Sequence, residues 1–207
     1  MKLPLARVGI AAAILTLPAV ASAQQVGVKA GANFASLTPE EDETPDTSRR
    51  VGLVAGGWLA VPATSWLTMQ FEGLFSEKGV KFDATGIGLG SSAELRVRYI
   101  ELPVLARVAV GGSGSTRVFL VGGGAPAFMT STRATATFEG QKDSRDVTDE
   151  VESFDFGLVG GAGVAFGRTN LEARYTHGLR PINKDRNEPN DRVQNRVFSV
   201  TVGVRLR

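Results

Sequence analysis

Apolar and polar residues alternate with a period of two along much of the chain after its first 23 residues. This pattern is typical of β-strands, because successive side chains of a strand point to opposite sides. Segment 67–76 shows it most clearly. One face holds Leu67, Met69, Phe71, Gly73 and Phe75, and the other holds Thr68, Gln70, Glu72 and Ser76. The same segments carry no convincing helical period, so the sequence predicts an all-β protein.

Seven further segments complete the predicted set of strands. Segments 26–34, 99–108, 171–176 and 198–206 alternate clearly, whereas segments 50–60, 116–130 and 153–166 are weaker. The weaker segments contain glycine and alanine on both faces, so the side to which each residue points is ambiguous. We therefore expect eight strands, three of them with an undetermined orientation.

The connections between these strands alternate in length. Long ones fall at about 36–49, 79–92, 131–151 and 181–195, and short ones at 61–65, 111–115 and 167–170. Outer-membrane barrels have short periplasmic turns and long extracellular loops. The sequence thus predicts a closed, eight-stranded antiparallel transmembrane β-barrel. Because the number of strands is even, both ends of the barrel domain would lie on the short-turn side.

Charged residues indicate which face of the strands meets lipid. An Arg or Lys facing lipid at mid-depth costs about 2–4 kcal/mol, and the charges on the clear strands share one face. Six residues are therefore predicted to face the lumen: Lys29, Glu72, Glu101, Arg107, Glu172 and Arg174. Since eight strands leave an interior just wide enough for side chains, we expect a structural ion-pair network. A selectivity ring in a narrow channel is the alternative.

Arg96 and Arg98 depart from this rule, because they share a face with the apolar Ile100. Either the strand extends beyond the bilayer at this point, or a β-bulge resets its alternation. Both arginines directly follow a long connection, so the first explanation is favoured.

The N-terminus has the features of a secretory signal. Lys2 and Arg7 precede an apolar run, and Ala21-Ser22-Ala23 matches the small-residue rule for cleavage before Gln24. We expect residues 1–23 to be removed and residues 24–207 to form the barrel domain. A membrane-spanning helix needs about 18 or more apolar residues, and this run is shorter.

Composition excludes several classes of function. The chain has 23 basic and 21 acidic residues, and the segment before Gln24 holds two basic and no acidic ones, so the remainder is formally neutral. With no basic patch containing interleaved aromatic residues, nucleic acid is not an expected partner. The absence of cysteine excludes thiol catalysis, disulfides and cysteine metal sites.

Several stretches resemble the small eight-stranded outer-membrane barrels of the PorT-like and OmpX-like type, often labelled the porin family. The matching stretches are 26–34, 70–79, 99–107, 155–163 and 172–179, of which Tyr99-Ile100-Glu101-Leu102-Pro103 is the most specific. The resemblance implies location in the outer membrane of a Gram-negative cell. It also implies transport by the secretion machinery and insertion by the barrel assembly machinery. One departure is the C-terminal Arg205-Leu206-Arg207, because such barrels commonly end on an aromatic residue.

Candidate catalytic and ligand-binding motifs are weak. His177 is the only histidine. A lipid-modifying barrel would need a nucleophile close to it, but the residue two positions further on is Leu179, which is not a nucleophile. Acidic residues cluster in two loops without the spacing of a calcium site: Glu40, Glu41, Asp42, Glu43 and Asp46 in the first, and Asp143, Asp146, Asp149 and Glu150 in the third. The glycine-rich stretch 86–90 lacks the residues of a phosphate-binding loop. We expect no catalytic residue, cofactor or metal.

These patterns favour an integral outer-membrane protein that is not an enzyme and has a structural or surface-interaction role. Expected partners are outer-membrane lipid and lipopolysaccharide, and the extracellular ligand is unknown. The alternatives are a narrow channel for small solutes, a soluble lipocalin-like binder and a lipid-modifying enzyme.

Overall fold

The computed structural model describes residues 24–38, 47–83, 91–138, 141–146, 153–179 and 194–207. The regular elements in these ranges are all strands: β1 (Gln25–Thr38), β2 (Thr47–Pro62), β3 (Leu67–Asp83), β4 (Ser91–Glu101), β5 (Val104–Ser113), β6 (Thr116–Phe138), β7 (Gln141–Asp146), β8 (Phe154–Phe166), β9 (Thr169–Gly178) and β10 (Gln194–Arg205). In the described ranges, no helix is long and apolar enough to cross a membrane.

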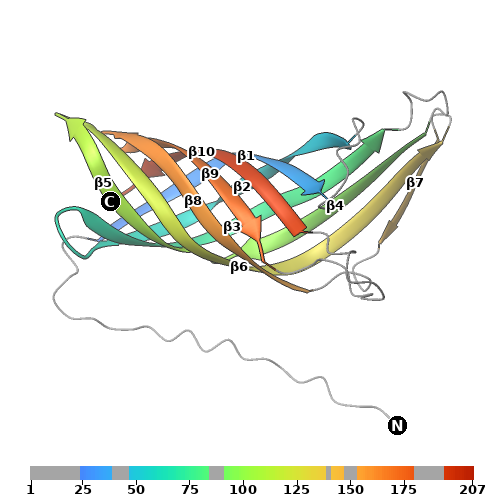
Figure 1. Ribbon diagram of the computed structural model, residues 1–207, viewed down its shortest axis with the longest axis horizontal. Coiled ribbons are helices and arrows are strands. Elements are labelled where there is room, and N and C mark those ends of the chain that lie inside the picture. The colour runs from blue at the N-terminus through green and yellow to red at the C-terminus, as the bar shows by residue number, and fades with distance from the viewer. Residues whose placement is uncertain (1–23, 39–46, 84–90, 139–140, 147–152, 180–193) are drawn as a thin grey trace, which may run out of the picture.

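The strands form one closed antiparallel barrel (Figure 1). Each ring strand pairs with its sequence neighbours, and β1 closes the ring by pairing with β10 over twelve residue pairs, from Gly27↔Arg205 to Thr38↔Gln194. β4 and β5 both pair with β3 on one side and with β6 on the other, so together they act as one ring strand. The described part of the ring therefore has eight strands, which confirms the predicted architecture.

The interruption between β4 and β5 lies at Pro103. Proline has no backbone N–H to donate to a neighbouring strand. Hydrogen bonding nevertheless continues on both sides of the break, because Glu72 N donates to the Pro103 carbonyl oxygen (3.0 Å) and Leu102 N donates to the Pro126 carbonyl oxygen (2.9 Å). The alternation of faces is also preserved across Pro103, so segment 99–108 behaves as the single strand that the sequence predicts.

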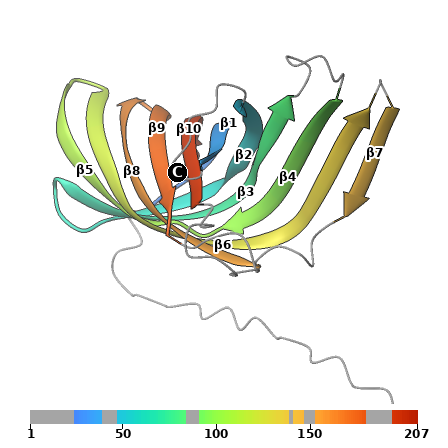
Figure 2. The same ribbon diagram turned by 45° about the vertical axis from the view of Figure 1, so that its right-hand side comes forward.

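The short turns lie where they were expected, but the opposite end of the barrel differs. Short turns join β2 to β3, β5 to β6 and β8 to β9. The predicted long connection at 131–151 is wrong over much of its length, because β6 continues to Phe138 and pairs with β7. Similarly, β3 reaches Asp83 and β4 begins at Ser91, within the predicted connection at 79–92. Figure 2 shows β6 and β7 side by side at this end.

The long strands explain the outward-facing arginines. A barrel strand needs about 9–11 residues to cross the membrane, and β6 has 23. The ladder between β4 and β6 shifts between Arg98 and Tyr99, and the extra residue is Thr130 on β6. The alternation of β4 itself is not reset, so Arg96 and Arg98 lie on the outward face of an extended strand, as favoured from the sequence.

Burial follows the predicted alternation. Apolar side chains such as Val28, Phe71, Val104, Leu171 and Val202 are exposed on the outside. In the glycine-rich strands, the inward residues are now defined, and they include Val54 and Trp58 of β2, Phe119 and Val121 of β6, and Asp155 and Val159 of β8. A soluble lipocalin-like binder would need the reverse arrangement, with its apolar face inside.

Two glycines make room for large inward side chains. Gly27 is the cross-strand partner of Trp58, and Gly163 is that of Phe119. A Cβ at either position would collide with the ring of the partner. The glycine content of the weak strands therefore has a packing function, because each aromatic side chain lies over a partner without a side chain.

Aromatic side chains lie near both ends of the outer surface. Phe34 contacts Phe198 and Phe128 contacts Phe154 at one end, with ring centroids 6.3 and 5.3 Å apart. Phe166 lies on the outer face at the opposite end of β8. At about 3.3 Å per residue and a tilt of about 45°, the distance along β8 from Phe154 to Phe166 corresponds to a height of roughly 28 Å. This height is close to that of the apolar band of outer-membrane barrels, about 25 Å.

Candidate functional site: the lumen

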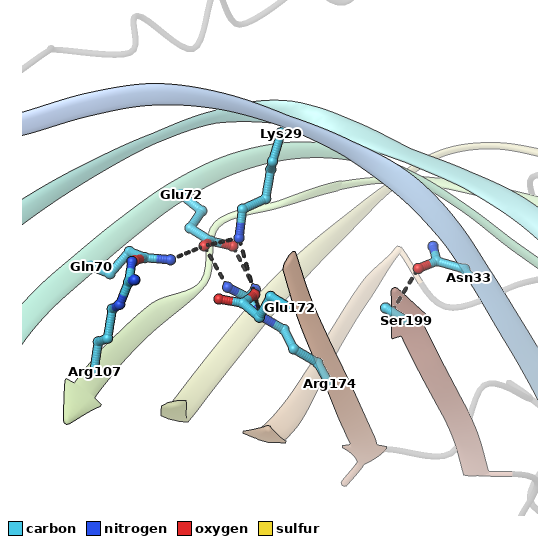
Figure 3. Close-up of polar contacts among 8 residues, drawn as sticks. All are labelled: Lys29, Asn33, Gln70, Glu72, Arg107, Glu172, Arg174 and Ser199. Atoms are coloured by element: carbon cyan, nitrogen blue, oxygen red, sulfur yellow. Dashed lines mark hydrogen bonds and ion pairs between the residues drawn. The ribbon is translucent and has the colours of Figure 1, made fainter. Parts of the chain in front are cut away.

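The six residues predicted to face the lumen all lie on inward faces of the strands. Lys29 comes from β1, Glu72 from β3, Glu101 from β4, and Arg107 from β5. Glu172 and Arg174 both come from β9. Four of the six, Lys29, Glu72, Glu172 and Arg174, contact one another and form what we call the central network (Figure 3).

Glu72 is the centre of this network. Its Oε1 lies 2.8 Å from Lys29 Nζ, and Arg174 donates to both carboxylate oxygens, from Nη2 to Oε1 at 2.6 Å and from Nη1 to Oε2 at 2.7 Å. This two-pronged pairing matches the planar guanidinium to the carboxylate. Glu172 pairs with Lys29 at 3.2 Å and with Arg174 Nε. Two cations thus face two carboxylates, and the set is formally neutral.

Arg107 joins the network indirectly. Its guanidinium lies 3.5 Å from the centroid of the Phe119 ring, and its Nη1 lies 3.5 Å from Gln70 Oε1. Gln70 in turn donates to Glu72 Oε1 at 2.5 Å. Arg107 is therefore on the short-turn side of the central network, and it has no carboxylate partner among the described residues.

Glu101 is not part of the central network. It pairs with Lys78 at 2.7 Å, and Lys78 Nζ lies 5.0 Å from the centroid of the Tyr99 ring. A second polar cluster lies close by, where Asn33 Nδ2 donates to Ser76 Oγ (2.8 Å) and Ser199 Oγ donates to Asn33 Oδ1 (2.7 Å). Polar contacts therefore continue from the central network toward the long-loop end.

Sequence reasoning missed three inward residues, Lys78, Asp155 and Trp58. It also missed the contact of Gln70 with the charged residues. Lys78 falls at the edge of a segment assigned to a loop, so its alternation could not be used. Asp155 and Trp58 lie in strands with glycine or alanine on both faces. Gln70 was placed on the correct face, but its hydrogen bond to Glu72 has no signal in the sequence.

Little space remains around the network. The side chains of Lys29, Glu72 and Glu172 are no more than 1% exposed. The cavity between this network and the Lys78–Glu101 pair has a volume of about 20 Å³. A volume of this size holds about one water molecule, so little free space lies beside the central network.

The other candidate residues are dispersed. His177 lies on the outward face of β9, opposite Leu158 on one side and Arg196 on the other. Asp143 and Asp146 lie on β7, whereas Asp149, Glu150, the acidic residues of 40–46 and the glycines of 86–90 are outside the described residues. The described residues contain no group of three or more His, Cys, Asp or Glu side chains that could hold a metal ion.

Comparison with solved structures found small surface barrels. The attachment invasion locus protein Ail of Yersinia pestis is 13% identical, with 88% of this chain and 98% of that chain covered and a TM-score of 0.44. Neisserial surface protein A is 14% identical, with 89% and 98% covered and a TM-score of 0.46. Comparison with curated proteins gave no match.

The family assignment rests on a separate comparison, with models of protein families. The model of the family described as outer membrane protein beta-barrel domain matches residues 20–184, which is most of the chain. The closed ring and the apolar outer surface agree with this match. The chain belongs to the outer membrane β-barrel domain family, and its location is the outer membrane.

Proposed function

We propose that this protein is a non-conducting, non-catalytic outer-membrane barrel with a structural or surface-interaction role. The observation that carries the proposal is the occluded lumen, in which Lys29, Glu72, Glu172 and Arg174 meet with about 20 Å³ of free volume beside them. A channel for small solutes requires a continuous water-filled path. The role then belongs to the outer surface, the strand extensions and the loops.

The absence of catalysis is part of the same proposal. Barrel enzymes that modify lipid need a nucleophile beside an activating base on the surface. The cross-strand neighbours of the outward His177 are Leu158 and Arg196, and neither can act as a nucleophile. The buried carboxylates Glu72 and Glu172 are both engaged by cations of the central network.

The extended strands offer a contact site for the expected lipid partner. Arg96 of β4 lies opposite Arg133 of β6, and Arg98 follows on the same outward face. Three carboxylates are nearby, since Arg98 pairs with Glu77 (3.0 Å), Arg96 pairs with Glu94 (3.2 Å), and Asp146 of β7 is the cross-strand partner of Arg133. Arginine binds phosphate through paired hydrogen bonds, so we propose that this outward arginine group contacts lipopolysaccharide phosphates. We also propose that residues 1–23 direct export and are then removed.

Conductance tests the proposal directly. Purified protein inserted into planar bilayers is expected to give no channel openings, because the central network fills the lumen. A protein with smaller side chains at the network, Glu72→Ser together with Arg174→Ser, is the matched control for detecting conductance through a widened lumen, because it removes one charge of each sign and keeps the Lys29–Glu172 pair. Openings of the unmodified protein that recur in independent insertions and in independently purified samples would show that it is a channel.

The central network is expected to contribute to stability. Replacing Glu72 with Gln leaves two buried cations sharing one carboxylate, and breaking a buried pair costs about 3–5 kcal/mol. Glu77→Gln is the matched control, because its partner Arg98 is partly exposed and exposed pairs are worth about 0–1 kcal/mol. Urea unfolding in lipid vesicles, followed by the heat-dependent shift on gels, measures both variants. Equal losses of stability would refute the structural role of the central network.

The lipid contact has its own test. Protein extracted in mild detergent is expected to retain lipopolysaccharide, detectable by mass spectrometry of the intact complex. The triple variant Arg96→Gln, Arg98→Gln and Arg133→Gln should retain at least several-fold less, because three phosphate ligands are removed. The matched control, Lys142→Gln together with Arg145→Gln, removes two exposed cations from β7 at the same end of the barrel and leaves Arg96, Arg98 and Arg133 in place. Retention that is the same in both variants would contradict the proposed contact.

A further inference from the structure

A second hollow lies at the short-turn end of the lumen. It has a volume of about 340 Å³ and is formed by residues at the short-turn ends of the ring strands. We call it the vestibule. Pockets that bind small molecules commonly occupy about 300–1,000 Å³. In contrast to the occluded centre, the vestibule has room for a ligand.

The vestibule carries charge of one sign. Four arginines line it, Arg107, Arg117, Arg168 and Arg205, and its lining contains no Asp or Glu. None of the four forms an ion pair with another residue in the part of the chain that the structure describes; Arg205 Nη2 has only a 3.5 Å contact with the Gly167 carbonyl oxygen. An adjoining hollow is lined by Arg168, Arg205 and Arg207, so the positive charge continues to the rim.

The central network does not neutralise this charge. Its two cations and two carboxylates already balance one another, and it lies between the vestibule and the rest of the lumen. A concave site lined by one sign of charge concentrates its electric field and attracts counter-ions. Four guanidinium groups without carboxylate partners therefore favour an anion that itself carries several charges.

The remaining lining is rich in hydrogen-bond donors. Trp58 is 4% exposed, and its indole Nε1 has no acceptor among the described residues. An indole N–H can only donate, and a buried donor without an acceptor is costly. Ser65, Thr68 and Asn170 also line the vestibule. A phosphate group has several oxygen atoms that can accept these hydrogen bonds, so this lining favours phosphate over a neutral ligand with few acceptors.

From these observations we propose that the vestibule is a binding site for an anion with two or more phosphate groups, reached from the periplasm. Arginine is the side chain best suited to phosphate, because its planar fork donates two parallel hydrogen bonds. A single carboxylate would leave three of the four cations uncompensated. The phosphates can belong to a soluble compound or to the headgroup of a lipid such as cardiolipin. This site is independent of the outward arginine group and of the occluded centre.

The chain provides an internal reporter for the test. Its two tryptophans, Trp58 and Trp66, both line the vestibule. Protein with Trp66→Phe, extracted from outer membranes in zwitterionic detergent, is titrated with inorganic pyrophosphate at constant ionic strength. We expect a saturable change in Trp58 fluorescence and none with acetate. Calorimetry on the unmodified chain gives the affinity without depending on fluorescence.

Charge removal distinguishes a built site from general attraction. The double variant Arg117→Gln and Arg168→Gln changes two exposed side chains and should weaken pyrophosphate binding at least about tenfold, since each lost charge-assisted pair contributes strongly. Lys142→Gln together with Arg145→Gln is the matched control, because it removes two exposed positive charges from β7, at the opposite end of the barrel and outside both arginine groups. The heat-dependent gel shift shows that each variant is folded. Binding that is unchanged in the Arg117→Gln, Arg168→Gln variant, or equally weakened by the control, overturns the proposal.

A lipid arm identifies the source of the phosphate. The protein with Trp66→Phe is placed in phosphatidylcholine vesicles with and without cardiolipin. A cardiolipin-dependent change in Trp58 fluorescence that pyrophosphate reverses assigns the site to a lipid headgroup. A response to pyrophosphate alone assigns it to a soluble compound, and both results support phosphate recognition. The absence of a saturable response in both arms overturns it.

Discussion

The structure depends on one constraint, which is that neither an unpaired backbone polar group nor an ionised side chain is tolerated in hydrocarbon. A closed ring satisfies the backbone, because every ring strand has a partner on both sides. The β1–β10 ladder provides the closure, with twelve residue pairs. Alternation satisfies the side chains, since within the membrane-spanning part each ring strand directs its charged residues away from lipid and its apolar residues toward it. The narrow lumen follows, because eight strands leave space only for side chains.

Inside that lumen, the charges connect strands that are distant around the ring. Lys29 on β1 and Glu72 on β3 meet Glu172 and Arg174 on β9. These contacts fix the shape of the cross-section as well as filling it. The same arrangement separates a densely packed centre from an open vestibule on the short-turn side. Because the described acidic groups inside the barrel lie in the centre or toward the long-loop end, the arginines of the vestibule have no carboxylate partner among the described residues.

The sequence was sufficient for the strands that separate large apolar residues from charges. Along β3, for example, Phe71 and Glu72 define the two faces without ambiguity, and the closed ring follows from the alternating lengths of the connections. It was insufficient where residues are small on both sides, as in β2, where only the structure shows that Trp58 points inward over Gly27. The extension of β6 and its pairing with β7 were missed because β7 is polar throughout and exposed. A strand that projects into water has no apolar face, so its sequence does not show the alternation by which the other strands were predicted.

The candidate site was predictable only in part, and for a similar reason. Alternation assigns Glu72 and Arg174 to the same interior, but the pairing partners depend on the stagger between strands, which the sequence does not encode locally. Glu101 illustrates this, because it has the same inward orientation as Glu72 yet pairs with Lys78. The vestibule was also invisible, since Arg117, Arg168 and Arg205 are far apart in sequence and are brought together only by closure of the ring.

Single-cysteine labelling tests the central claim most directly, and the chain contains no cysteine of its own. With cysteine introduced at Phe71 or Val104, the folded barrel in lipid vesicles should react with a lipid-soluble maleimide and remain protected from a charged, membrane-impermeant one. Cysteine introduced at the exposed turn residue Ser65 is the matched control and should react with the charged reagent. Rapid reaction of the Phe71 and Val104 positions with the charged reagent, at the rate of Ser65, would show that the apolar face is exposed to water and would contradict the account.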